Sequence, residues 1–175
     1  MFSNPELNIK KLGLREGMRV ADFGAGTGMY SKAVSKIVGD AGKVYAIEVI
    51  KNLVKKLENE ISNEHLPNIE VIWGDIEEKH GTKIADHILD AVIVSNVLFQ
   101  VPDKLGLIDE AKRILRKGGK LLFIDWSDSF NSMGPIADDI ITPDKAVEMF
   151  TSRGFKLLEN IIVSDHHYGI IFIYE

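Results

Sequence analysis

The stretch that decides the fold of this chain reads Val20-Ala21-Asp22-Phe23-Gly24-Ala25-Gly26-Thr27-Gly28-Met29-Tyr30-Ser31. A short apolar strand ends here in an acid and then breaks into a glycine-rich loop. Glycine lets a ligand approach the main chain closely, and the free N–H groups of the helix that follows face the same opening. This order of strand, glycine loop and helix predicts a turn that holds a nucleotide or a nucleoside.

The spacing of the glycines differs from that of dinucleotide-binding enzymes. Their motif is G-x-G-x-x-G, with the pyrophosphate at the helix N-terminus. Gly24 and Gly26 fit this motif, but Met29 stands where the third glycine belongs and Gly28 comes one residue early. The carboxylate of Asp22 would repel a pyrophosphate and would attract an ammonium or sulfonium group. The loop therefore favours a positively charged nucleoside over a dinucleotide.

Three further apolar runs end in polar residues. The run at 44–49 contains Glu48, whose carboxylate can accept hydrogen bonds from both hydroxyls of a ribose. The run that begins at Ile69 leads into Asp75, and the run at 89–96 closes with two small polar residues. Four such strand ends would deliver polar groups to one edge of a sheet.

The rest of the chain alternates helical and strand patterns. We expect helices at about 5–12, 28–38, 53–61, 103–116 and 143–153, and strands at about 18–23, 44–49, 69–73, 89–96 and 120–125. Such alternation predicts an α/β fold, with a parallel sheet and helices on both faces.

The pattern changes after the fifth strand. Residues 126–143 form a long polar stretch, for which a functional loop or lid is the leading explanation. The final apolar runs, 155–163 and 169–174, are separated by 164–168 and predict a hairpin. Lys117-Gly118-Gly119 is expected to end the helix at about residue 116.

On these motifs the chain resembles the class I S-adenosylmethionine-dependent methyltransferases, nearest to the small-molecule branch that includes the ubiquinone and menaquinone biosynthesis C-methyltransferases. The resemblance covers nearly the whole chain. It implies one domain over residues 1–175, with a Rossmann-like, mostly parallel sheet of seven strands in the order 3-2-1-4-5-7-6 and an antiparallel last strand. The implied cofactor is S-adenosyl-L-methionine, with the following contact residues: Asp22, Gly24, Ala25, Gly26, Gly28, Glu48, Val49, Gly74, Asp75, Ile76, Ser95, Asn96 and Val97.

The resemblance also implies a role for each part of this set. The glycine loop wraps the methionine part of the cofactor, with Asp22 near the amino group, and Glu48 holds the ribose. Asp75 accepts from the exocyclic amine of adenine while the backbone of Ile76 addresses the ring. The segment 95–97 passes beneath the sulfonium.

Composition bounds the class of protein. The 175 residues are 45% hydrophobic and 27% charged, which fits one globular domain. The apolar runs are too short to span a bilayer and the N-terminus does not resemble a signal peptide, so we expect a cytoplasmic protein without a membrane span. The absence of cysteine removes disulfides, thiolate metal sites and thiol nucleophiles.

Charge argues against nucleic acid as a partner. The formal net charge is −5 and the basic residues are scattered, whereas nucleic-acid affinity rests on clustered Lys and Arg. The basic groups at 51–56 and 112–120 are expected to be solvated helix surfaces.

The acceptor side is less defined by the sequence. His166, His167 and Tyr168 are candidates for the substrate wall, and either histidine could act as a general base because imidazole titrates near neutral pH. We expect no metal site, since adjacent residues of an extended chain point to opposite sides. An apolar acceptor pocket could be supplied by Phe2, Phe99, Trp126, Phe130 and Tyr168.

These observations predict an enzyme of class EC 2.1.1.- that transfers a methyl group to a small organic acceptor by in-line displacement. A protein acceptor is one alternative. Others are a non-catalytic S-adenosylmethionine-binding regulatory or assembly subunit, and a Rossmann oxidoreductase. A homodimer is a further alternative, in which a second subunit completes the open pocket.

Overall fold

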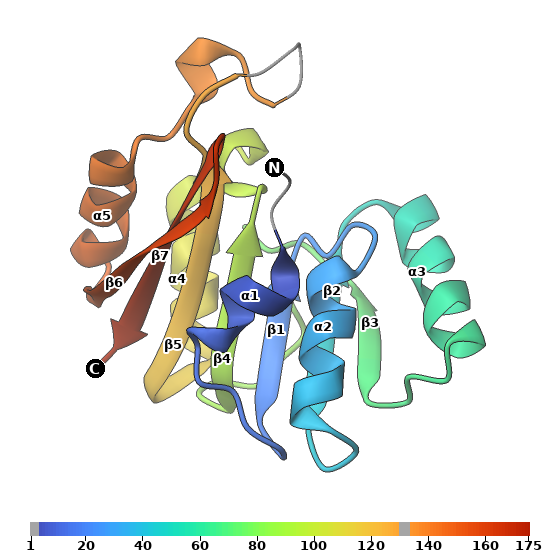
Figure 1. Ribbon diagram of the computed structural model, residues 1–175. Helices are drawn as coiled ribbons and strands as arrows, with labels where there is room; N and C mark the ends of the chain where they lie inside the picture. The colour runs from blue at the N-terminus through green and yellow to red at the C-terminus, as the bar shows by residue number, and fades with distance from the viewer. Residues whose placement is uncertain (1–3, 130–133) are drawn as a thin grey trace.

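The computed structural model describes residues 4–129 and 134–175. These residues form a seven-stranded sheet in the order β3-β2-β1-β4-β5-β7-β6, which confirms the predicted strand order (Figure 1). β7 is antiparallel to both of its neighbours, and the remaining pairs are parallel. The strands are β1 (Arg19–Phe23), β2 (Lys43–Glu48), β3 (Ile69–Trp73), β4 (Leu89–Ser95), β5 (Leu115–Trp126), β6 (Phe155–Ser164) and β7 (His167–Tyr174).

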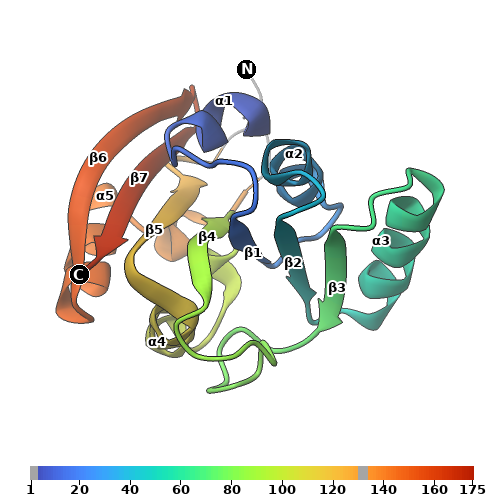
Figure 2. The same ribbon diagram turned by 90° about the horizontal axis from the view of Figure 1, so that it is seen from below.

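Helices cover both faces of this sheet, as predicted. Figure 2 shows α1, α2 and α3 on one face and α4 and α5 on the other. Two short 3-10 turns, η1 (Leu98–Gln100) and η2 (Ala137–Asp139), follow β4 and β5. The α-helices of the described residues are α1 (Pro5–Lys10), α2 (Met29–Val38), α3 (Lys51–Asn63), α4 (Lys104–Ile114) and α5 (Pro143–Ser152).

Each face of the sheet carries its own hydrophobic core. The central strands β1 and β4 are buried on both faces because helices cover both, as in other parallel sheets, whereas the edge strands β3 and β6 are partly exposed. On the α1–α3 face, Val34 and Leu57 pack with the sheet. On the other face, Phe150 of α5 stacks on Phe172 of β7 with ring centroids 4.4 Å apart. The ring of Phe123 of β5 also lies against the Phe150 ring, with centroids 5.2 Å apart. These cores fix the strand ends where the polar residues lie.

The predicted starts of two helices are confirmed in atomic detail. The Asn4 side chain accepts from Leu7 N at the start of α1, and the Thr142 side chain accepts from Lys145 N at the start of α5. A proline follows each cap at the first helical position, where its missing N–H costs nothing. α1 ends at Lys10, short of the predicted residue 12.

The prediction that Lys117-Gly118-Gly119 ends a helix at about residue 116 is wrong. α4 ends at Ile114, because Leu115 is already extended and pairs with Leu89 of β4. The next pair in the ladder joins Ala91 to Lys120, so the glycines lie in a bulge at the start of β5. The glycines therefore lie in the irregular start of a strand rather than at a helix end.

The predicted hairpin is confirmed, but its loop is shorter than 164–168. β6 reaches Ser164 and pairs it with His167, so the turn consists of residues 165–166. Tyr168 consequently lies within β7, opposite Asp125 of β5. Of the described helices, none combines the length and the apolar character needed to cross a membrane.

Candidate functional site

A cavity of about 460 Å³ lies at the carboxyl ends of the central strands. Its size is typical of a small-molecule site. Several residues that the sequence assigns to the cofactor line it: Gly24, Gly26, Glu48, Val49, Gly74, Asp75, Ile76, Asn96 and Val97. Asp22, Ala25, Gly28 and Ser95 are not part of its lining, and the roles assigned to all thirteen residues stay predictions.

The glycine loop forms one wall of the cavity. A Cβ atom on Gly24 would lie 2.8 Å from Val97 Cγ2, so the loop and the segment after β4 approach too closely for a side chain. Gly26 has a left-handed φ of +53°, and a Cβ atom there would come near only the Gly24 carbonyl oxygen, at 3.8 Å. The wall at Gly26 is therefore bare backbone that a ligand can approach.

Glu48 is held rigidly at the end of β2. Its Oε2 accepts from Gly26 N at 3.1 Å, and its Oε1 accepts from Val49 N and Ile50 N at 2.9 Å each. The residue is only 6% exposed, yet it lines the cavity. Its carboxylate is thus fixed by three backbone amides before any ligand arrives.

Asp22 lies behind the glycine loop rather than in the cavity lining. Its Oδ2 accepts from Ser31 N at 3.0 Å and from Ser31 Oγ at 2.6 Å, which ties the end of β1 to the first turn of α2. Burial raises the pKa of Asp22 to about 6, against these two hydrogen bonds, and nearby Glu48 raises it further. Two carboxyl groups, of which only that of Glu48 lines the cavity, therefore lie near the glycine loop, a combination that favours a cation.

The segment after β3 forms the opposite wall. Asp75 Oδ1 accepts from Glu77 N at 2.9 Å, which turns the chain at Ile76. Beyond the residues that the sequence predicted, the cavity is also lined by Ile47, Ile50, Leu53, Glu77, Gln100 and Val101. The positions just after β2 and after Asp75 could have been found by extending each strand-end motif by two residues. Gln100 ends the η1 turn and Val101 follows it, and the sequence does not signal this turn.

Two buried oxygens lie at the ends of β4 and β5. Asn96 Oδ1 and Asp125 Oδ2 have no hydrogen-bond partner among the residues that the structure describes. Asn96 has a left-handed φ of +56° and its N–H donates to Ile124 O at 2.9 Å, so the two side chains start from neighbouring strand ends. A buried acceptor without a donor is costly in the free protein, so each of these atoms is a position where a ligand or a water would be bound.

The Asp125 carboxyl is almost fully buried, at 1% exposure. Burial raises its pKa to about 7, while the Trp126 amide that donates to Oδ1 at 2.9 Å acts in the opposite direction. Tyr168 lies opposite on β7 and donates from its hydroxyl to Ile141 O at 2.6 Å. Burial also raises the pKa of Tyr168, so that its hydroxyl stays protonated.

The Asp125 carboxyl should make stability depend on pH. An unfolded Asp titrates near 3.8 and this one near 7, so within that window the folded chain binds more protons than the unfolded chain. The free energy of unfolding should therefore fall as pH rises from about 4 to about 7. Asp125→Asn should flatten this decline and raise the free energy of unfolding by ~2 kcal/mol at about pH 8. Urea denaturation at a series of pH values measures it.

Asp40→Asn serves as the control, because Asp40 is exposed in the loop after α2. It should leave the pH profile unchanged. Asp22, whose pKa is about 6, should retain a smaller decline in the Asp125→Asn variant. A variant profile identical to that of the wild type would show that burial does not raise the pKa of Asp125 above its unfolded value.

The residues predicted to form the acceptor wall lie in the turn before β7 and at the start of that strand. His166 Nδ1 is 2.7 Å from Asp128 Oδ1, and the His167 ring packs on Trp126 with centroids 4.1 Å apart. Burial lowers the pKa of His167, and the neighbouring His166 lowers it further. The described residues contain no group of three His, Asp or Glu arranged to hold a metal ion. Phe2 and Phe130, which the sequence assigned to the pocket, lie outside the described residues.

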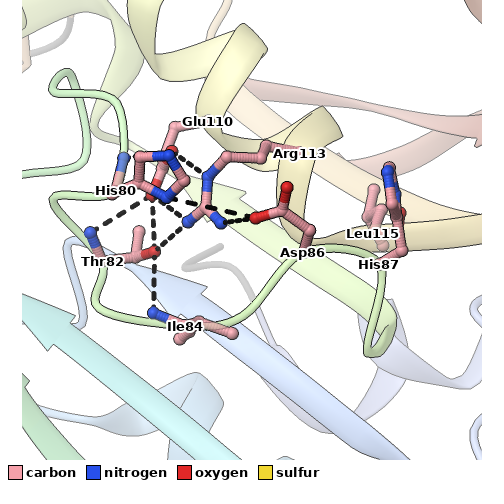
Figure 3. Close-up of polar contacts among 8 residues, drawn as sticks. All are labelled: His80, Thr82, Ile84, Asp86, His87, Glu110, Arg113 and Leu115. Atoms are coloured by element: carbon pink, nitrogen blue, oxygen red, sulfur yellow. Dashed lines mark hydrogen bonds and ion pairs between the residues drawn. The ribbon is translucent and has the colours of Figure 1, made fainter.

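The expectation that 112–120 is a solvated basic surface is wrong at Arg113. Its side chain is 9% exposed and pairs with the buried Glu110 at 2.7 Å (Figure 3). The pair joins α4 to the loop between β3 and β4. Lys51, from the other basic group, lies 4.3 Å from the centroid of the Trp73 ring.

Curated proteins of known activity resemble this chain in sequence. Among curated relatives, the chain is 28% identical over 158 residues to the ubiquinone/menaquinone biosynthesis C-methyltransferase of Hahella chejuensis, covering 90% of this chain and 59% of that protein. It is 30% identical over 119 residues to a demethylmenaquinone methyltransferase of Staphylococcus aureus, covering 68% and 47%. The chain thus spans roughly half of the length of these curated relatives.

Solved structures share the whole fold. A SAM-dependent methyltransferase from Aquifex aeolicus superposes with a TM-score of 0.90 at 26% identity, over 99% of this chain and 91% of that one. A cyclase superposes with a TM-score of 0.82 at 16% identity, over 97% and 80%, which shows the fold alone. A family model described as a methyltransferase domain matches residues 14–154. Because this match covers most of its length, the chain belongs to the methyltransferase-domain family.

Proposed function

We propose that this protein is an S-adenosylmethionine-dependent methyltransferase that acts on a small organic acceptor. The observation that carries the proposal is the wall of the cavity, where the buried carboxylate of Glu48 stands beside the bare backbone of Gly26. A carboxylate at the end of the second strand can accept from both ribose hydroxyls, and it would reject a 2′-phosphate.

The residues of the cavity fit this cofactor. Glu48 is already oriented by three amides, so one hydroxyl of a diol finds a free acceptor position and the second would replace one of the amides. Ile76 and Val97 supply apolar surface on either side, and Asn96 Oδ1 needs a donor. The two carboxyl groups of Asp22 and Glu48 favour the positive charge of a sulfonium.

When bound, the cofactor supplies a methyl group on a positively charged sulfur, which is a good leaving group. The protein then has to hold the acceptor in line with that methyl group and to exclude water. Orientation of this kind can contribute up to roughly 7–11 kcal/mol to lowering the barrier. An acceptor that must lose a proton also needs a base, and His166 is the candidate because Asp128 fixes its ring.

A small acceptor is supported by the named activities of the relatives and by aromatic side chains at the same edge of the sheet. The relatives are named as quinone methyltransferases. Trp126 is the last residue of β5, Phe99 lies in η1 after β4 and Tyr168 is the second residue of β7, so they share this edge of the sheet, although none of them lines the cavity. The net charge of −5 disfavours a nucleic acid. The proposal includes one domain over residues 1–175 and a cytoplasmic location. It holds for a monomer and for a homodimer.

Titration calorimetry followed by a transfer assay tests the function. The wild-type protein should bind S-adenosylmethionine and S-adenosylhomocysteine and should not bind NADH. It should then transfer label from methyl-labelled S-adenosylmethionine to at least one member of a panel of hydroxylated aromatic compounds. Mass spectrometry of the product identifies the methylated atom.

The possible results separate the alternatives. Binding without transfer to any small molecule or protein would favour a regulatory or assembly subunit. Label found in an added protein would replace the small acceptor by a protein acceptor. Binding of NADH in place of S-adenosylhomocysteine would indicate an oxidoreductase.

A further inference from the structure

A buried ion pair on α4 holds the loop that joins β3 to β4. Glu110 is 1% exposed and accepts from Arg113 Nε and Nη2 at 2.8 and 2.7 Å. It also accepts from the loop, through His80 N at 3.0 Å, Thr82 N at 3.2 Å and Thr82 Oγ1 at 2.6 Å. Arg113 reaches on to Asp86 of the same loop (Figure 3). Two side chains of one helix thus bind three separate residues of the loop.

This loop touches the cavity at its first residues. Gly74 and Asp75 line the cavity, and both lie directly against Gly81. A Cβ atom on Gly74 would come 2.5 Å from Gly81 O, and one on Gly81 would come 2.0 Å from Asp75 O. Backbone packs on backbone here, so a shift of the loop at Gly81 must move the cavity wall at Gly74 and Asp75.

The start of α4 holds the loop at a second point. Glu77 Oε1 accepts from Asp103 N at 2.5 Å, and a Cβ atom on Gly106 would come 2.5 Å from Glu77 O. Glu77 also lines the cavity. The cavity wall from Gly74 to Glu77 is therefore held between the N-terminal turn of α4 and the ion pair near its C-terminal end.

The loop would not keep this shape without support. His80, Lys83 and His87 have φ values of +64°, +60° and +57°, a left-handed conformation that is unfavourable for residues other than glycine. Such conformations persist where the surrounding contacts over-determine them. For His80 the contacts of Glu110 supply that support, because they bind the amide of His80 itself and two groups of Thr82, and the amide of His87 donates to Arg113 O at 2.9 Å.

We propose that Glu110 and Arg113 are positioning residues for the nucleoside half of the cofactor, acting through His80, Thr82 and Gly81 on the cavity wall at Gly74–Glu77. This inference rests on the proposed function for the identity of the ligand and for the predicted place of its nucleoside half at Gly74–Glu77. The ordering of the loop by the ion pair is a property of the free protein. Cofactor affinity then depends on a helix that does not itself line the cavity.

The charge of Glu110 is essential to this arrangement. All of its partners are donors, so a neutral amide of the same size would turn its NH2 group against one of them. Burial alone would raise the pKa of Glu110, but the hydrogen bonds from Arg113, Thr82 and His80 outweigh it and lower the pKa to about 2. Glu110 is accordingly ionised at every pH at which the protein would be assayed.

The test compares Glu110→Gln with the wild type in two measurements. Calorimetry with S-adenosylhomocysteine and with 5′-methylthioadenosine, which lacks the amino-acid part, should show both affinities weakened by the same factor of about ten, or ~1.4 kcal/mol. Hydrogen exchange of the free protein should speed up at 74–87 and stay unchanged in β1 and α2. A purely structural role would lower the melting temperature without this selective pattern.

Two further variants keep the test decisive. Asp86→Asn changes a half-exposed partner of Arg113 and should fold, with a loss of about threefold in both affinities. Glu148→Gln is the matched control, because Glu148 forms an exposed ion pair with Lys145 at the same spacing on α5. It should change nothing.

Unchanged affinity for both ligands in folded Glu110→Gln and Asp86→Asn would overturn the proposal. So would unchanged exchange at 74–87, which is measured without any ligand. If the wild type bound neither ligand, the proposed cofactor would be wrong, and the exchange measurement would still decide whether the ion pair orders the loop.

Discussion

Glu48→Ala should weaken the binding of S-adenosylmethionine by about a hundredfold, equivalent to ~3 kcal/mol. The substitution removes a charged acceptor for two ribose hydroxyls. It also removes the group that fixes three amides, those of Gly26, Val49 and Ile50. Loss of the carboxylate therefore loosens two walls of the cavity at once. Calorimetry with S-adenosylhomocysteine measures the change.

Glu70→Ala is the matched control for this variant. Glu70 lies on the neighbouring strand β3, where it forms an exposed ion pair with Lys43 at 3.1 Å, and it does not line the cavity. It should leave cofactor affinity within about twofold of the wild type, because exposed ion pairs contribute little. Equal cofactor affinity in Glu48→Ala and Glu70→Ala would mean that Glu48 does not bind the ribose.

Phe150→Ala should lower the free energy of unfolding by ~3–5 kcal/mol. Phe150 is fully buried and its ring lies between those of Phe172, Phe123 and Phe155, at centroid distances of 4.4, 5.2 and 5.7 Å. Removal of the ring leaves a cavity among groups that three strands, β5, β6 and β7, hold in place, so the structure cannot collapse to fill it. Urea denaturation followed by circular dichroism measures the loss.

Ile162→Ala provides the comparison, because Ile162 on β6 is 98% exposed and loses no burial when shortened. It should change the free energy of unfolding by less than about 0.5 kcal/mol. A loss below about 1 kcal/mol in Phe150→Ala would mean that the aromatic cluster contributes little to docking α5 on the sheet.

The fold could be predicted from the sequence where local pattern and tertiary role coincide. The apolar runs that end at Asp22 and Glu48 predict buried strands, and their polar ends predict the edge of the sheet at which a ligand binds. Asn4 and Thr142 mark helix starts through side chains that act within one turn. These features depend only on residues that are close in the sequence, so they can be predicted without knowledge of distant contacts.

The features that the sequence hid depend on distant partners. Arg113 reads as a member of a basic, solvated surface, yet it is buried because residues 80–86 fold over α4 to meet it. Leu115 reads as part of a helix, yet pairing with Leu89 extends it. Asp125 is expected at a strand end, yet it is 1% exposed and pairs with Tyr168 of β7, more than forty residues further along the chain. In each case a contact over many residues overrode the local preference.

The position of β7 has a consequence for how the protein is made. β6 lies at the edge of the sheet and its one strand neighbour is β7, which follows it in the chain. During synthesis β6 therefore emerges before the strand on which it must pair, and the ring of Phe150 emerges before Phe172 covers it. The pairing of β6 and the covering of the Phe150 ring both wait for β7, so this part of the sheet is the last of the described fold to form during synthesis.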